Sequence, residues 1–120
     1  MKKVLWVSRH QMTPEQLADL ERVMQDQVEL LQYKDTLKTV DELKPLLPQV
    51  QAIAVVLPLE MVAQLMPLAG DRPVLQSVSR RIPSGRMLHL ADGRAEEEFV
   101  FEHNGWQQIV HLQLQLKLLS

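Results

Sequence analysis

The sequence predicts one α/β domain of the Rossmann type, a Rossmann-like parallel sheet of about four strands with flanking helices and a C-terminal antiparallel meander. Segments of strand length alternate with segments of helical periodicity over residues 1–86, which is typical of a parallel sheet. The segment 51–57 is apolar on both faces, as expected of a central strand covered by helices. Hairpin signals then replace this alternation over residues 87–120. We therefore expect a single domain over 1–120, with βα units in 1–86 and an antiparallel β extension in 87–120.

The first third of the chain contains two strands and one helix. β-Branched and aromatic residues predict a buried strand over 2–8. Thr13 then caps a helix, Pro14 suits the first helical position, and Gln16 completes a capping box. A second strand is predicted over 28–33.

The middle of the chain continues the alternation. Another capping-box pattern begins at Thr39, but Pro45 and Pro48 predict a short or distorted helix. The strand 51–57 follows, and a third helix begins at Pro58 and ends at Gly70. A fourth strand is predicted over residues 73–79.

The last third is predicted to be a three-stranded meander. Asp92-Gly93 and Asn104-Gly105 are hairpin signals that divide it into strands at 87–90, 97–103 and 106 onward. Leucines alternate with polar residues from 109 to 118, which indicates a half-buried strand near a sheet edge.

Composition excludes several classes of function. The chain contains no cysteine, which excludes disulfides, thiolate metal sites and thiol catalysis and agrees with a cytoplasmic protein. No apolar run reaches the length of a membrane span, so we expect no membrane partner. The four histidines lack paired ligand spacing, so no metal or other cofactor is expected. Phosphate-binding glycine motifs of the dinucleotide and P-loop types are absent.

Charge is unevenly distributed along the chain. The net charge is −2, which disfavours binding to duplex nucleic acid. Four arginines and no acid nevertheless lie between Arg72 and Arg86. This local positive segment favours a compact anionic ligand.

Candidate ligand-binding residues follow the predicted strands, because open parallel sheets bind ligands at the carboxyl ends of their strands. Ser8, Arg9 and His10 follow the first strand, and Pro58 follows the third. The fourth strand is followed by serines and arginines over 79–86, which suit phosphate oxygens. Amides at the helix start, 13–16, could add a positive dipole end. The alternatives are a solvated loop at 8–10 and, most of all for Arg81, a charged strand end.

The segment Val7-Ser8-Arg9-His10-Gln11-Met12-Thr13-Pro14-Glu15-Gln16 resembles small stand-alone CRISPR-associated proteins with a Rossmann-like (CARF-related) domain. Relatives in that family bind cyclic oligoadenylates, and some are ring nucleases that linearise this second messenger. The resemblance covers the N-terminal third best, and Ala52–Pro58 and Ser79–Arg86 are compatible with it. It implies a homodimer that binds one ring, with cyclic tetra-adenylate favoured, across its two-fold axis.

The resemblance also implies a metal-independent reaction that switches off type III CRISPR signalling. The ribose 2′-hydroxyl attacks the adjacent phosphorus and leaves a 2′,3′-cyclic phosphate. Arg9 and Arg80 then stabilise the phosphate, Ser8 and Ser79 position it, and His10 serves as general base or acid. The expected catalytic residues are Arg9, His10 and Arg80, and the expected ligand-binding residues are Ser8, Arg9, Gln11, Pro58, Ser79, Arg80, Arg81, Ser84, Gly85 and Arg86.

Three other functions remain open from the sequence. The chain could sequester the same ligand without cleaving it. It could be an interaction module that uses the alternating strand Ile109 to Leu118, which can pair with another chain. A phosphotransferase or hydrolase acting on a mononucleotide ranks last, because neither a nucleophile nor a metal site is visible.

Overall fold

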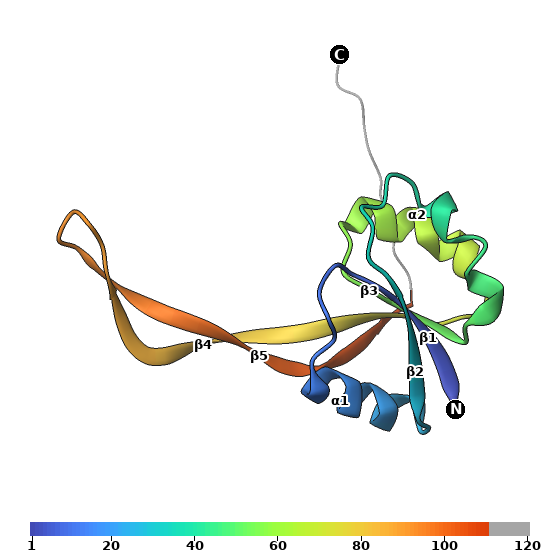
Figure 1. Cartoon of the computed structure of the whole chain (residues 1–120), viewed down its shortest axis with the longest axis horizontal. Coiled ribbons are helices and arrows are strands. Elements are labelled where there is room, and N and C mark those ends of the chain that lie inside the picture. Colours follow the sequence, from blue (N-terminus) through green and yellow to red (C-terminus); the bar gives the residue numbers. More distant parts are fainter. Residues whose placement is uncertain (111–120) are drawn as a thin grey trace, which may run out of the picture.

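The computed structural model describes residues 1–110 as a mixed α/β fold around one five-stranded sheet (Figure 1). The strand order is β2-β1-β3-β4-β5; the first four strands are parallel, and β5 is antiparallel to β4. The predicted run of parallel strands is therefore confirmed. The strands are β1 (Lys2–Val7), β2 (Val28–Tyr33), β3 (Ala52–Val55), β4 (Val74–His89) and β5 (Ala95–Ile109), and the helices are α1 (Pro14–Met24) and α2 (Leu59–Ala69).

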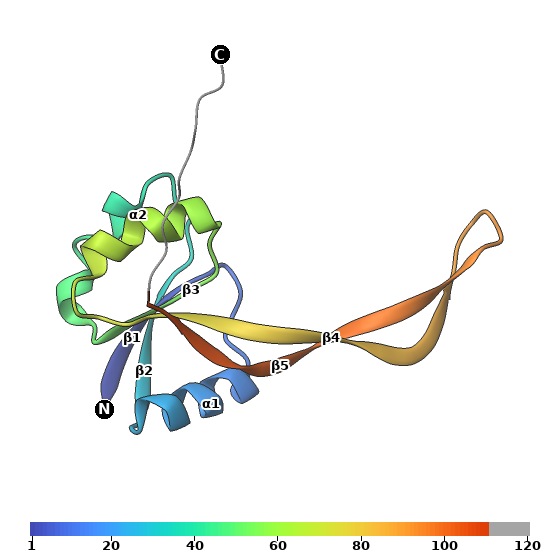
Figure 2. The ribbon, with the colours of Figure 1, turned by 180° about the vertical axis from the view of Figure 1, so that it is seen from behind.

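The sheet is covered on both faces, as Figure 2 shows from behind. On one face, Val4 and Trp6 of β1 pack with Leu20 of α1. On the other face, Leu5 and Val7 pack in the core cluster that includes residues of α2. Successive strand residues point to opposite faces, so an apolar run is what a doubly covered strand requires. No helix within residues 1–110 is long and apolar enough to cross a membrane.

Helix α1 begins with the predicted capping box. The Thr13 hydroxyl accepts a hydrogen bond from the Gln16 amide at 3.2 Å, and the Gln16 side chain accepts one from the Thr13 amide at 2.9 Å. This reciprocal pair satisfies two amides of the first turn. It also means that the Gln16 amide is not free to bind an anion.

Replacing Thr13 by alanine is expected to lower the free energy of unfolding by about 1 kcal/mol, because the Gln16 amide loses its acceptor. Urea denaturation at neutral pH measures this change. Thr39→Ala is the matched control. The Thr39 hydroxyl caps only a four-residue 3₁₀ turn, where it accepts a longer hydrogen bond of 3.4 Å from the Asp41 amide, so we expect a smaller loss of stability. Equal losses at the two positions would contradict the assigned role of the capping box.

The second predicted helix is replaced by two 3₁₀ turns, η1 (Val40–Leu43) and η2 (Leu47–Gln49). Proline at 45 and at 48 removes helical amide donors and prevents an α-helix from propagating. Val40, Leu43 and Leu47 are nevertheless buried against the sheet. The short or distorted element expected from the sequence is thus confirmed. Its apolar side chains still pack into the hydrophobic core.

The three-stranded meander predicted for residues 87–120 is wrong over the described residues. Strand β4 does not end at residue 79 or 86 but continues to His89, and β5 returns beside it as one long strand. The turn at Asp92-Gly93 is confirmed: the Gly93 amide donates to the Leu90 carbonyl, and Gly93 has a φ of 88°. The boundary expected at residue 86 therefore falls inside a continuous strand.

The part of this hairpin over 80–102, called the arm below, projects away from the rest of the fold (Figure 1). Strand β3 pairs with β4 only from Val74 to Gln76, so farther along β4 has β5 as its one partner in the described sheet. A strand of 16 residues spans about 50 Å at the usual rise of about 3.3 Å per residue.

Asn104-Gly105 forms a bulge in β5 rather than the predicted second hairpin turn. Ser77 pairs with Trp106 whereas Ser79 pairs with His103, so β5 holds one extra residue. Gly105 has a φ of 112°, a backbone conformation that favours glycine. The same residue pair thus meets the backbone requirement of a bulge. Beyond Val110, the predicted alternating strand Ile109 to Leu118 lies outside the described residues.

Candidate functional site

A pocket lies at the carboxyl ends of β1, β2 and β3. The strand order reverses between β1 and β3, because the chain proceeds from β1 outward to β2 and then returns to the other side of β1. Ligand sites of open α/β sheets lie at such a reversal. The pocket has a volume of about 370 Å³, within the usual range for small-molecule sites. Its lining residues are Val7, Ser8, Arg9, His10, Tyr33, Asp35, Thr36, Leu37, Val56, Leu57, Pro58 and Met61.

The loop after β1 is held in place by hydrogen bonds to its backbone. The indole Nε1 of Trp6 donates to the His10 carbonyl at 2.8 Å. The Gln32 amide group donates to the carbonyls of both Ser8 and His10 at 3.0 Å. Because Trp6 is buried, the loop is anchored to the core of the sheet. The backbone of this loop is therefore fixed, and both Arg9 and His10 line the pocket.

Ser8 has a structural role within this loop. Its side chain is buried, and its hydroxyl oxygen accepts a hydrogen bond from the His10 amide at 3.1 Å. The hydroxyl proton is still available as a donor. The Ser8 hydroxyl thus orients the loop, and its proton can still be donated to a ligand.

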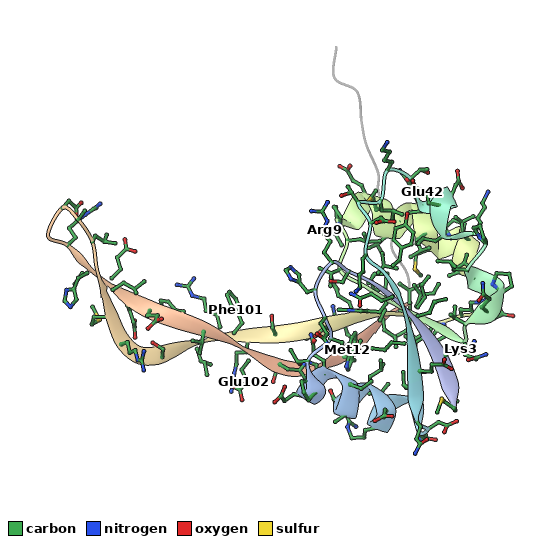
Figure 3. All side chains as sticks on the ribbon, in the orientation of Figure 1. Lys3, Arg9, Met12, Glu42, Phe101 and Glu102 are labelled. Atoms are coloured by element: carbon green, nitrogen blue, oxygen red, sulfur yellow. The ribbon has the colours of Figure 1, made fainter. Side chains whose placement is uncertain are left out.

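Arg9 is placed between an apolar pocket and a polar hollow. The polar hollow, of about 420 Å³, is lined by Arg9, Gln11, Gln32 and Lys34. Within residues 1–110, Arg9 and Lys34 form no ion pair or side-chain hydrogen bond. Two adjacent exposed cations without an acid partner attract anionic groups. Figure 3 shows Arg9 close to α2, whose Met61 lines the same pocket.

The first turn of α2 contributes to the same pocket. Pro58 is its N-cap and supplies no side-chain hydrogen bond to the helix amides. The first amides with described intrahelical partners are those of Met61 and Val62, which donate to the Pro58 carbonyl. The preceding amides are left for solvent or a ligand, and the helix dipole favours negative charge there. Glu60 in the same turn partly opposes this effect.

Tyr33 and Asp35 give the pocket hydrogen-bonding groups of another kind. The pKa of the Tyr33 phenol is raised, first by desolvation and then by the nearby carboxylates of Glu42 and Asp35. The phenol therefore stays protonated at neutral pH. Asp35 is an acceptor that suits an amino or hydroxyl group and repels phosphate. The pocket thus offers the guanidinium of Arg9 and the carboxylate of Asp35.

The structure separates the predicted site residues into distinct surfaces. Ser8, Arg9, His10 and Pro58 line the pocket together, and Gln11 lines the adjoining polar hollow. The residues predicted to follow the fourth strand lie in β4 instead, because that strand continues through them. Within one copy of the chain they do not line the pocket with Arg9. These residues are Ser79, Arg80, Arg81, Ser84, Gly85 and Arg86.

Three of those residues have side-chain partners within the arm. Arg80 forms an ion pair with Glu102 at 3.1 Å, and the Arg81 guanidinium lies 3.7 Å from the centre of the Phe99 ring. The Ser84 hydroxyl donates to Glu98 at 2.9 Å. Cross-strand pairs of this kind stabilise a two-stranded ribbon. Arg80 and Arg81 are thus explained by cross-strand contacts.

Residues distant in the sequence form a polar network at the base of the arm. His103 Nε2 lies 2.9 Å from Asp19 Oδ2, and His103 Nδ1 lies 3.2 Å from the Ser77 hydroxyl. The Gln16 side chain donates to that hydroxyl at 3.2 Å. A histidine protonated at Nε2 satisfies all these contacts, with Ser77 donating to Nδ1. The network joins α1 to β4 and β5 and fixes where the arm leaves the sheet.

The sequence could not reveal this network, because Asp19 and His103 are 84 positions apart and the members follow no common spacing. The one available signal was that His103 ends the strand predicted over 97–103. The Ser79 and Phe101 side chains line an adjacent hollow of about 520 Å³.

Replacing Asp19 by asparagine is expected to lower the free energy of unfolding by about 1–2 kcal/mol at pH 7, since a charged acceptor is lost. The pKa of Asp19 is lowered, first by its hydrogen bond to His103 and then by Arg22. A lowered folded-state pKa contributes stability above the unfolded value of 3.8, and this contribution disappears as pH falls through the folded value.

The measurement is urea denaturation of both proteins between pH 7 and pH 3. The difference between wild type and Asp19→Asn should shrink as the pH falls below 4. Asp41→Asn, at an exposed ion pair with Lys44, is the control and should change stability little. A difference that stays constant over the whole pH range would exclude the carboxylate as its source.

A comparison of the chain with protein-family models, curated proteins and solved structures finds no significant match. The geometry of the pocket, together with the resemblance of residues 7–16, therefore carries the functional proposal.

Proposed function

We propose that the chain binds a cyclic oligoadenylate, one ring across a homodimer, in the pocket at the carboxyl ends of β1 and β3. The observation that carries the proposal is Arg9: an exposed guanidinium without a described partner, fixed at its backbone, between an apolar pocket and a polar hollow. The sheet order has a reversal of the type at which nucleotides bind in doubly wound folds.

Each part of an adenylate has a suitable counterpart in the pocket. The apolar lining, which includes Leu57 and Met61, suits the faces of an adenine base. Asp35 can accept a hydrogen bond from the adenine amino group or a ribose hydroxyl. Arg9 and Lys34 suit the phosphates, because charge-assisted hydrogen bonds to phosphate are strong and Arg can bind in a bidentate manner.

A symmetric ring requires only part of these contacts from each subunit. In a two-fold dimer the same groups of both copies meet equivalent parts of the ligand. Two copies of Arg9 and Lys34 therefore supply four cations to one ring. Cyclic tetra-adenylate, with four phosphates, is the ligand we favour.

Cleavage requires only Arg9 and His10 in this proposal, since Arg80 is paired in the arm. The 2′-hydroxyl loses its proton to the His10 imidazole and attacks the adjacent phosphorus. The bond from phosphorus to the 5′-oxygen breaks, and that oxygen takes up a proton from water while His10 returns its proton to solvent, which leaves a 2′,3′-cyclic phosphate and a 5′-hydroxyl. Arg9 offsets the charge that develops on the phosphate.

Sequestration without cleavage is the second candidate function. The specific observation in its favour is that, among residues 1–110, one arginine per subunit lines the pocket, whereas the expected second one, Arg80, lies in the arm. Binding needs cations near the phosphates, but cleavage also needs an in-line attack geometry.

The test is incubation of the purified protein with cyclic tri-, tetra- and hexa-adenylate in EDTA, followed by chromatography of bound, free and cleaved ligand. Linear products ending in 2′,3′-cyclic phosphate support the ring nuclease. Tight binding with intact ligand supports sequestration. Absence of both for all three rings overturns the proposed ligand.

A further inference from the structure

The arm has two faces, and one of them carries an apolar stripe with a charge at each end. Directly opposed residues of two paired strands share a face, and so do alternate residues of one strand. Arg81 is opposed to Phe101, and Met87 to Glu97, in the β4–β5 register. The members of the stripe are Arg81, Pro83, Met87, Glu97, Phe99 and Phe101.

Two apolar side chains of this stripe, one beside each charged end, are strongly exposed. The Phe101 side chain is 75% exposed and that of Met87 is 53% exposed. Figure 3 shows Phe101 and Glu102 pointing to opposite sides of the arm, as their adjacent positions in a strand require. Within residues 1–110, no other element packs over this part of the arm. An exposed apolar stripe of this kind marks an interaction surface.

The arm also needs support that its own two strands do not provide. Isolated two-stranded hairpins are marginally stable in water, and three or more strands or a packed partner are needed. Strand β3 and helix α1 support only the base of the arm, through Gln76 and the residues around His103. The remainder depends on cross-strand pairs such as Arg80 with Glu102.

We propose that this stripe is a self-association surface and that its partner is the same stripe of a second copy of this chain, placed antiparallel. The charges at the two ends of the stripe are complementary. Arg81 lies at the end of the stripe near the base of the arm, and Glu97 lies at the end toward the tip. A two-fold antiparallel contact reverses one arm, so Arg81 of each copy approaches Glu97 of the other.

The contact also covers the exposed apolar residues. Phe101 is directly opposite Arg81 in the register, so the reversed partner brings Met87 and Glu97 toward it. Aromatic residues that become buried in an interface typically contribute much of its affinity. A parallel arrangement would instead place Arg81 near Arg81 of the second copy, which is unfavourable. This inference depends on the arm alone and not on the proposed ligand.

The experiment is analytical ultracentrifugation of the full chain without nucleotide. Wild type should form a dimer. Arg81→Glu and Glu97→Arg should each weaken association by about tenfold, and Phe101→Ser by about tenfold or more. An equimolar mixture of the Arg81→Glu and Glu97→Arg proteins should recover the wild-type affinity, because each stripe then meets opposite charges.

Glu96→Arg is the matched control. It makes the same charge change as Glu97→Arg at the neighbouring position, whose side chain lies on the opposite face of the arm. It should leave the dimer affinity unchanged. The rescue by mixing separates a surface effect from misfolding, since two misfolded proteins do not restore each other. A wild-type monomer in the high micromolar range, or a mixture no tighter than its components, overturns the inference.

Discussion

Replacement of Arg9 by alanine is expected to weaken cyclic tetra-adenylate binding by about 10- to 100-fold. A hydrogen bond to a charged group contributes about 1.5–3 kcal/mol, and each 1.4 kcal/mol is about tenfold in affinity. The effect is large because Arg9 has no described protein partner that would compete for its guanidinium. Isothermal titration calorimetry at fixed salt measures it.

Arg80→Ala is the matched control for this experiment. The sequence placed both arginines at strand ends, but Arg80 is ion-paired with Glu102 on the exposed arm. Its ligand affinity should stay within about twofold of wild type, because an exposed ion pair contributes little. If both substitutions weaken binding equally, the ligand is not confined to the pocket at β1 and β3.

Replacement of Trp6 by alanine is expected to lower the free energy of unfolding by about 3–5 kcal/mol, as deletion of a buried aromatic side chain does. Trp6 is 2% exposed and packs edge-on against Trp106, with ring centres 6.1 Å apart. Such a loss is a large part of the stability of a typical domain. Urea denaturation followed by far-ultraviolet circular dichroism measures it.

Trp6→Phe separates packing from the hydrogen bond to the loop. Phenylalanine fills most of the space but cannot donate to the His10 carbonyl, so we expect a loss of about 1 kcal/mol and weaker ligand binding. Trp106→Phe is the control, since its indole donates to the Gln16 carbonyl away from the pocket. It should reduce stability and leave ligand affinity unchanged. Equal affinities of the two variants would show that the Trp6 contact does not position the loop.

Local signals in the sequence were sufficient for the regular elements. The strand Val28–Tyr33, the capping box at Thr13 and the helix after Pro58 are all present at the predicted positions. These features depend on neighbours within a few residues, through apolar periodicity and terminal hydrogen bonds. The prolines at 45 and 48 likewise predicted a short or distorted element, which the structure forms as two 3₁₀ turns.

The arm shows where local signals failed. Asn104-Gly105 accommodates positive φ, which both a hairpin turn and a bulge require, so the dipeptide alone cannot distinguish them. The sequence also did not predict where β4 ends, because polar residues such as Ser79 and Arg80 occur in exposed two-stranded ribbons as well as in loops. The pairing with β5 decided both questions.

The sequence by itself determined the alternation of strands and helices, the buried central strands and the position of Ser8, Arg9 and His10 after β1. Each of these follows from interactions between residues close in the chain. The tertiary structure alone decided that Arg9 and Lys34 are without described partners while Arg80 is paired with Glu102. It alone brought Asp19, Ser77 and His103 together. The physical reason is that strand register and strand order set which distant side chains meet, and neither is encoded in local periodicity.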